Sequence, residues 1–282
     1  MKQIRFLADL FLFSSALTAL CAVCLCMATE KLVNNETPAI FNALHLFVFG
    51  CSLLVYNIHS IAKIFRSRRA GQQPGVRLPQ FVYFVTGAAG LVLALTGFTI
   101  FTPAMIEGCL VLGVLSFAYS LPILPFKNRK RLREYGWLKI LALAGVWTVV
   151  TSVLPVLYWH HTVSKYPFEI LLRFAFIFTL CIIFDLRDVR RDAAENIQTL
   201  PNTIGLKNSY RLIDISILIF IALSLLQYFR YPVWERFAGS FITAVLTHYV
   251  ALYLRRHPTE RRYALLGDGL MLVYVALVFL LP

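Results

Sequence analysis

Charged side chains are scarce in this sequence. Only 15% of its 282 residues are charged, the acidic residues number 14, and 59% of the chain is hydrophobic. A soluble domain of this length has too little interior to bury so much apolar surface, so the composition excludes a soluble globular protein. We therefore expect most of the chain to face lipid.

The six cysteines offer no clear metal or redox site. All six cysteines lie inside apolar stretches, although the spacing Cys21-x-x-Cys24 resembles a metal or redox motif. Inside a helix such a pair is more simply explained as two small packing residues.

Nearly the whole chain can be divided into apolar segments of the length that a helix needs to span a bilayer, about 17 to 25 residues. Backbone groups in lipid must be paired within a helix, and no segment alternates like a barrel strand, so we predict an all-α integral membrane protein. The first segment is longer than the apolar core of a secretory signal, and we expect it to remain as a helix. The nine predicted spans are 6–28, 38–62, 80–101, 103–121, 136–158, 168–186, 210–228, 234–254 and 263–281.

The net charge of +13 comes from basic residues that gather on one side of the predicted spans. Basic residues mark cytoplasmic loops, so we expect the N-terminus and the large loops in the cytoplasm, with the protein in a bacterial inner membrane. Topology and attraction to anionic membrane lipids explain this charge, and we expect no nucleic-acid partner. The opposite side holds five basic residues: Lys31, Lys165, Arg173, Arg230 and Arg236.

Five of the 14 acidic residues cluster within thirty positions that begin with the stretch "DLRDVRRD". Asp185, Asp188 and Asp192 follow the i, i+3, i+7 pattern and would share one face of a helix. Three carboxylates this close repel each other unless a cation lies among them. Oxygen ligands suit Mg²⁺, which often shares its coordination shell with a substrate phosphate. We therefore predict a Mg²⁺ site on these aspartates.

A second interpretation of this stretch is a solvated helix end, in which Arg187, Arg190 and Arg191 pair with the acids. The stretch "SFAYSLPILPFKNRKRLREYGWLK" before the fifth span favours the metal site, because it offers tyrosine, serine and lysine near the same membrane face. Acids for a metal and bases for an anion together make a diphosphate site.

With the following "NIQTLPNTIG", the stretch "DLRDVRRD" resembles the second aspartate motif of the UbiA superfamily of intramembrane prenyltransferases. "AYSLPILPFK" is similar to that family's Tyr-Ser…Pro…Lys segment, and the nine spans also match. The resemblance implies one UbiA-like domain over 1–282, with nine transmembrane helices around a central cavity that opens sideways to lipid. There a polyprenyl diphosphate would bind through Mg²⁺ on the cytoplasmic side, ionise and alkylate a small-molecule acceptor.

The resemblance also implies roles for single residues. The three aspartates would hold the metal, and Lys127 would join them as a catalytic residue on the diphosphate. Three further residues would bind substrate by positioning the diphosphate or the acceptor: Tyr119, Ser120 and Arg191.

The family's first aspartate motif, Asn-Asp-x-x-Asp-x-x-x-Asp, is incomplete here. Asn57 is present in "LLVYNIHSIAKIFRSRR", but the three aspartate positions hold Ile58, Ile61 and Phe65. The lysine that normally precedes "TL" is replaced by Gln198. Half of the usual metal-binding set is therefore missing, although Asn57 could still ligate a metal or hold a phosphate oxygen.

A basic stripe occupies the same predicted helix. His59, Lys63 and Arg66 follow the i, i+4, i+7 pattern. As fixed cations they would replace one Mg²⁺ ion in holding the diphosphate. The alternative is that Lys63 and Arg66 only extend from a helix end into the lipid headgroups.

Two other classes of function compete with catalysis. A non-catalytic descendant of the family would keep the fold as a lipid-binding or partner-binding protein. The loss of the first aspartate motif would then reflect the loss of catalytic activity. A transporter is disfavoured, because the sequence shows no clear inverted repeat and no pair of helices broken by Gly or Pro.

Overall fold

The computed structural model describes residues 10–12, 14–34, 41–69, 71, 78–97, 101–120, 136–194 and 199–281; the side chains of 66, 115–120 and 190–194 lie outside this description. Every regular element among the described residues is helical. The elements are α2 (Ala16–Asn34), α3 (Ala43–Arg69), α4 (Gln80–Gly97), α5 (Pro103–Ser120), α6 (Gly136–Thr148), the π-helix η3 (Val149–Val153), α7 (Leu154–Tyr158), the 3₁₀ turn η4 (Val163–Lys165), α8 (Pro167–Ala194), α9 (Leu200–Arg230), α10 (Trp234–Arg256) and α11 (Glu260–Leu280).

Eight helices of the described chain are long and apolar enough to cross a membrane, when α6, η3 and α7 are counted as one continuous helix, Gly136–Tyr158. At the fourth predicted span, the part of α5 whose side chains are described, Pro103–Val114, is also apolar. Each of the nine predicted spans therefore overlaps a helix. The prediction of an all-α integral membrane protein is confirmed.

The first predicted span is displaced. The sequence predicts a helix over 6–28, whereas α2 begins at Ala16 and continues to Asn34. Ser14 and Ser15 interrupt the chain before it, and Ser15 has a positive φ of 67°, which a right-handed helix does not allow.

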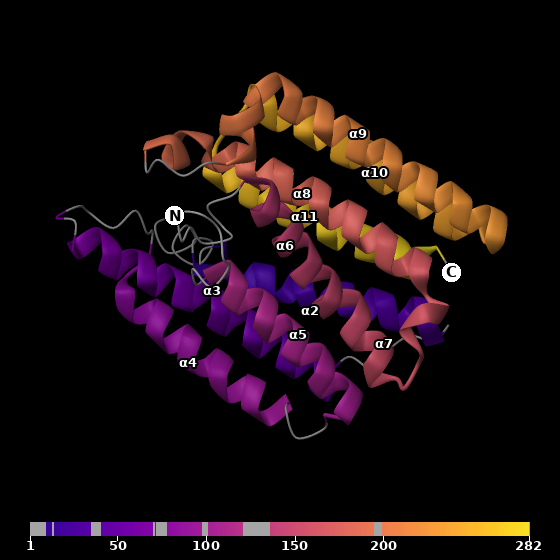
Figure 1. Ribbon diagram of the computed structural model, residues 1–282, viewed down its shortest axis with the longest axis horizontal. Helices are drawn as coiled ribbons and strands as arrows, with labels where there is room; N and C mark the ends of the chain where they lie inside the picture. Colours follow the sequence, from indigo (N-terminus) through magenta and orange to yellow (C-terminus); the bar gives the residue numbers. More distant parts are fainter. Residues whose placement is uncertain are drawn as a thin grey trace. The chain divides into compact units, whose positions relative to one another are not determined.

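The chain forms two compact units: Met1–Met27 with Pro38–Phe101, and Ala28–Thr37 with Thr102–Pro282. In the first unit α3 and α4 pack along each other (Figure 1). Glycine permits this close approach, because a Cβ atom on Gly50 would lie 2.6 Å from the carbonyl oxygen of Gly90 and 2.4 Å from the backbone nitrogen of Ala94. Small residues that let backbones approach closely are typical of helix contacts in membranes.

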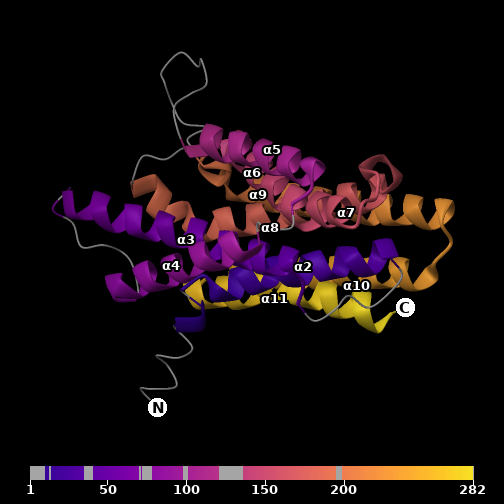
Figure 2. The same cartoon turned by 90° about the horizontal axis from the view of Figure 1, so that it is seen from below.

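The second unit is arranged around α8, which contacts α6, α9 and α11. α10 contacts α9 and α11, so the last three helices form a group beside α8 (Figures 1 and 2). Phe176 of α8 lies between two neighbours: its ring centroid is 5.9 Å from that of Phe220 on α9 and 5.3 Å from that of Tyr274 on α11. These aromatic contacts hold α8 in place, and α8 carries the predicted aspartates.

α9 contains a bend that the sequence marks with a glycine. Gly205 has φ 80° and ψ 156°, a conformation that is nearly restricted to glycine. The chain changes direction there, so a short turn beginning at Leu200 precedes the long part of α9 (Figure 1). This short turn follows the aspartate motif in sequence and returns to it in space.

The contact between α3 and α4 predicts an unusual response to alanine. In an ordinary helix Gly→Ala gains roughly 1 kcal/mol from helix propensity. Gly50→Ala should instead destabilise the protein by about 1–3 kcal/mol, because the added methyl group must displace backbone atoms of α4. Thermal unfolding in detergent would measure the change. Gly145→Ala is the matched control, since no described atom from outside its own stretch of helix lies within 4 Å of its added Cβ. Equal effects of the two variants would contradict the packing argument.

Candidate active site

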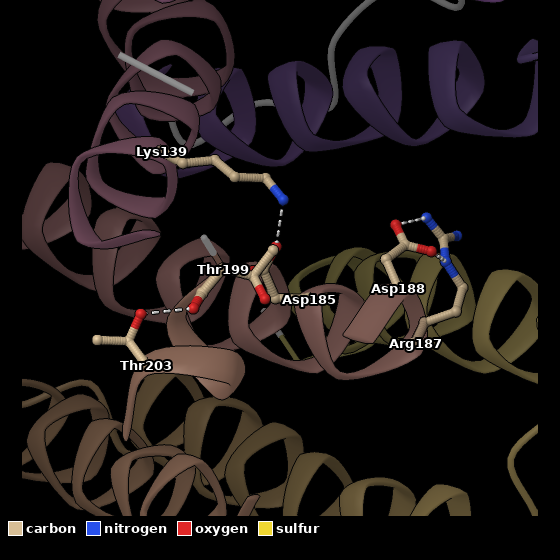
Figure 3. Close-up of polar contacts among 6 residues, drawn as sticks. All are labelled: Lys139, Asp185, Arg187, Asp188, Thr199 and Thr203. Carbon is tan, nitrogen blue, oxygen red and sulfur yellow. Dashed lines mark hydrogen bonds and ion pairs between the residues drawn. The ribbon is translucent and has the colours of Figure 1, made fainter. Parts of the chain in front are cut away.

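Asp185 is the centre of the candidate site. Its side chain stands near the end of the apolar part of α8 and is 6% exposed. Lys139, from the first turn of α6, places its ammonium nitrogen 2.6 Å from Asp185 Oδ1 (Figure 3). A carboxylate removed from water needs such a partner, because an unpaired buried charge is strongly unfavourable.

Asp188 lies one turn further along α8 and has a different partner. The guanidinium group of Arg187 forms a bidentate ion pair with Asp188: Nε donates to Oδ1 at 2.9 Å and a terminal nitrogen donates to Oδ2 at 2.9 Å (Figure 3). The same guanidinium group lies 5.3 Å from the ring centroid of Phe184. The interpretation in which neighbouring arginines pair with the acids therefore applies to Arg187 and Asp188.

The chain after the aspartate motif returns to Asp185. Thr199 and Leu200 are fully buried. A Cβ atom on Gly136 would lie 2.6 Å from the backbone nitrogen of Leu200. A glycine at the start of α6 therefore lets the backbone at Leu200 approach this helix closely. Thr203 donates its hydroxyl hydrogen to the carbonyl oxygen of Thr199 at 2.9 Å (Figure 3). The start of α9 thus packs against the start of α6, beside the helix that carries the aspartates.

Two buried oxygens at this site are available to a ligand. Asp185 Oδ2 and Thr199 Oγ1 have no hydrogen-bond partner among the residues that the structure describes. Buried polar atoms are nearly always paired in folded proteins, so a pair of unpaired oxygens is a sign of a missing ligand or water. Oxygen donors are what Mg²⁺ prefers, and Asp185 Oδ2 fits a metal in this respect.

The predicted three-aspartate Mg²⁺ site stays a prediction. The side chain of Asp192 lies outside the described residues. Within the described part of the chain, no group of three His, Cys, Asp or Glu side chains is placed to hold a metal ion.

Several other predicted site residues also fall outside the description. Lys127 is one of them, and so are the side chains of Tyr119, Ser120, Arg191 and Arg66. Their roles stay predictions.

Asn57 has a structural role in the first unit. Its amide nitrogen donates to the carbonyl oxygens of Ser14 at 3.2 Å and Leu53 at 2.7 Å, and Oδ1 accepts from the hydroxyl group of Thr86 at 3.0 Å. These bonds join α3 to α4 and to the segment before α2. Its predicted role as a metal or phosphate ligand stays a prediction.

The basic stripe lies near the end of α3. His59 is exposed and Lys63 is half-buried. Apolar residues hold the aspartate positions of the first motif, and two of them, Ile58 and Phe65, are exposed. The facing of this stripe and the aspartates across one cavity stays a prediction.

Sequence reasoning missed two residues of the site, Lys139 and Thr199. Lys139 was visible as a lysine one turn inside an apolar span, which is costly unless the lysine has a partner. Thr199 had a weaker signal, since only its position after the aspartate motif distinguishes it from other threonines.

The ion pair of Lys139 and Asp185 predicts strong coupling between these two residues. Lys139→Met should destabilise the protein by about 3–5 kcal/mol, because it leaves the carboxylate buried without a cation. The double variant Lys139→Met/Asp185→Asn should recover much of this loss, and thermal unfolding in detergent would complete the double-mutant cycle. If Lys139→Met melts at the temperature of the unchanged protein, the pair does not stabilise the site.

The fold of this chain is shared with solved membrane proteins. No protein-family model and no curated protein matches the sequence. A UbiA homologue from Archaeoglobus fulgidus bound to GPP and Mg²⁺ matches with a TM-score of 0.68 at 12% identity, over 97% of this chain and 99% of that one. The Cd²⁺-bound form matches with a TM-score of 0.65 at 11% identity, over 96% and 99%.

A digeranylgeranylglyceryl phosphate synthase in membranes matches over the full length of both chains, with a TM-score of 0.60 at 15% identity. At identities this low, the structural similarity shows the fold alone. The chemistry has to be argued from the residues of the site. The chain therefore has the helical fold of the UbiA homologues, as its second aspartate motif predicts.

Proposed function

We propose that the protein is an intramembrane prenyltransferase of the UbiA superfamily, which moves a polyprenyl group from a polyprenyl diphosphate to a small-molecule acceptor. The observation that carries this proposal is the buried Asp185, whose Oδ2 has no hydrogen-bond partner among the described residues, in a chain with the UbiA fold. A UbiA homologue with this fold is bound to GPP and Mg²⁺. By the distribution of basic residues, the site would open to the cytoplasm of a bacterial inner membrane.

The step that needs acceleration is the ionisation of the allylic diphosphate. The carbon–oxygen bond breaks and the diphosphate keeps the electron pair. The acceptor then bonds to the allylic carbon and releases a proton. Only contacts that strengthen as charge develops on the leaving group accelerate this step. When bound, Mg²⁺ would supply such charge, and the residues expected to hold it are Asp185, Asp188 and Asp192.

Two cations on the chain shape this site without a metal. Lys139 balances the charge of Asp185, and Arg187 orients Asp188 through two parallel hydrogen bonds. Such a fork fixes the direction of a carboxylate better than a lysine does. The aspartates would then be held ready for a substrate diphosphate, which Lys127, Arg191, Tyr119 and Ser120 would contact as the resemblance implies.

In place of the first aspartate motif, His59, Lys63 and Arg66 would contact the diphosphate directly. They would bring fixed positive charge to a place where related enzymes use carboxylates and metal. Arginine suits this role because its planar fork matches phosphate oxygens.

A second function is favoured by two features of the chain. Asp185 and Asp188 are already paired with cations of the chain, and the aspartate positions of the first motif hold Ile58, Ile61 and Phe65. These features also suit a repurposed UbiA-like protein that binds lipid and performs no transfer. Such a protein would bind a prenyl diphosphate without releasing diphosphate from it.

Diphosphate release therefore tests the proposal. The purified protein in lipid vesicles should consume GPP or a longer prenyl diphosphate only when Mg²⁺ is present. Asp185→Asn and Asp188→Asn should each lower the rate about a hundredfold, which corresponds to roughly 3 kcal/mol of transition-state stabilisation. Asp214→Asn is the control, because Asp214 is an exposed acid paired with His248 on α10. Unchanged release in excess chelator would contradict the metal, and binding without any release would favour the lipid-binding function.

The basic stripe gives a separate prediction. Lys63→Met should weaken binding of the prenyl diphosphate about tenfold to a hundredfold, because a charge-assisted contact contributes roughly 1.5–3 kcal/mol. Arg69→Met is the control, since Arg69 is exposed at the end of α3 and lies outside the proposed site. Equal and small losses in the two variants would mean that the stripe serves only topology and headgroup attraction.

A further inference from the structure

A second polar cavity lies at the other end of α8. Its volume is about 200 Å³, and it belongs entirely to the second unit. The helices that form it contribute the end of α2, the starts of α8 and α10, and the ends of α9 and α11; α11 ends beside the start of α8 (Figures 1 and 2). Its polar lining consists of Lys31, Glu169, Gln227, Glu235, Arg236, Ser240 and Tyr274.

This cavity is separate from the candidate active site. Glu169 precedes Asp185 by sixteen residues on the same helix, which is roughly 24 Å at the usual rise. The hydrocarbon core of a bilayer is about 30 Å thick, so two polar sites at this separation belong to opposite membrane faces. Nothing in the proposed transfer reaction uses the cavity.

Part of the charge in the cavity is balanced internally. Glu169 Oε1 accepts a hydrogen bond from the Gln227 side chain at 2.7 Å and lies 3.8 Å from a guanidinium nitrogen of Arg236. Behind Tyr274, the fully buried guanidinium group of Arg173 lies 4.9 Å from the ring centroid and donates to the Thr29 hydroxyl group at 3.1 Å. Glu169, Gln227, Arg236 and Tyr274 line the cavity, so these contacts fix part of its wall.

Two lining charges of opposite sign have no charged partner among the described residues. The Lys31 ammonium group donates to the carbonyl oxygen of Phe279 at 3.0 Å, a neutral acceptor, and forms no ion pair in the described chain. The half-buried carboxylate of Glu235 likewise has neither a hydrogen bond nor an ion pair there. A ligand that meets both needs an anionic group and a cationic group.

The rest of the cavity indicates an amphiphile. Leu172, Leu277 and Leu281 also line it, so apolar surface adjoins the two charges. The volume equals that of roughly seven water molecules, which suits a headgroup and is too small for a drug-sized molecule. The cavity lies where five membrane helices begin or end, the level at which lipid headgroups are found.

We propose that the cavity binds the headgroup of a phospholipid with a phosphoethanolamine group, its phosphate at Lys31 and its ammonium at Glu235. The acyl chains would then run along the apolar lining toward the bilayer. A primary ammonium has N–H donors for the Glu235 carboxylate, whereas the trimethylammonium group of phosphatidylcholine has none. The site therefore distinguishes these two zwitterionic lipids, and it distinguishes both from anionic phosphatidylglycerol.

Competition between lipids tests this assignment. The full-length protein in detergent is mixed with equal amounts of phosphatidylethanolamine, phosphatidylcholine and phosphatidylglycerol, and native mass spectrometry counts the lipids retained. Phosphatidylethanolamine should be retained preferentially. Lys31→Met should weaken retention of all three about tenfold, and Glu235→Gln should lower the preference for phosphatidylethanolamine over phosphatidylglycerol about tenfold.

The two variants separate binding from folding. Glu235→Gln keeps the size and shape of a half-exposed side chain, so it should melt like the unchanged protein and still lose the lipid preference. Lys165→Met and Glu107→Gln are the controls, because both residues are exposed and neither lines the cavity. Unchanged lipid preference in Glu235→Gln would overturn the proposal. Displacement of the lipid by an equal concentration of soluble phosphoethanolamine would also overturn it, because the apolar lining would then contribute nothing.

Discussion

The absence of water inside a bilayer is the constraint on which this structure depends. An ionised side chain there must find its partner within the protein, because no solvent can take that role. The pair of Lys139 and Asp185 is the clearest case, since it joins α6 to α8 at 2.6 Å where both helices are largely apolar. Gly136 and Leu200 bring the chain after the motif against the same point. Three segments distant in sequence are thereby fixed around one carboxylate.

The same constraint explains the polarity of α8 as a whole. Both of its ends carry charged groups with partners from other helices, and its middle carries aromatic contacts with α9 and α11. One end gathers aspartates with a lysine and an arginine. The other gathers a glutamate with an arginine and a glutamine. A helix with a polar site at each end has a fixed depth in the membrane, because sliding in either direction would move one site into hydrocarbon.

The part of the fold that could be predicted depends on properties of single segments of the sequence. Apolar length is a property of a single segment, so nine spans could be read from the chain and each overlaps a helix. Helical spacing predicts that Asp185 and Asp188 lie one turn apart on one helix, and both lie on α8. The start of α2 could not be read in this way, because Ser14 and Ser15 interrupt a stretch that is apolar on both sides. Hydropathy averages over such an interruption.

Partnerships between distant residues account for the part that could not be predicted. Lys139 and Asp185 are 46 positions apart, and the sequence around either residue does not indicate that the other is its partner. The same holds for Asn57, whose family motif suggests a ligand, but whose amide bonds to Ser14, Leu53 and Thr86 within its own unit. Motif spacing identifies which residues can do chemistry. Whether a residue is held by other side chains depends on tertiary contacts that spacing does not contain.

Charge balance gives a physical reason why the incomplete first motif is compatible with the proposed chemistry. Relative to the family pattern, three missing aspartates remove three negative charges, whereas one Mg²⁺ ion would have brought two positive charges. If the two motifs share one site as proposed, that site would be less negative even before Lys63 and Arg66 are counted. A diphosphate would be held at least as well by such a site. The rate of ionisation would be lower instead. A fixed lysine would attract the bound substrate and the departing diphosphate about equally, whereas a metal ion would stabilise the departing diphosphate more strongly than the bound substrate.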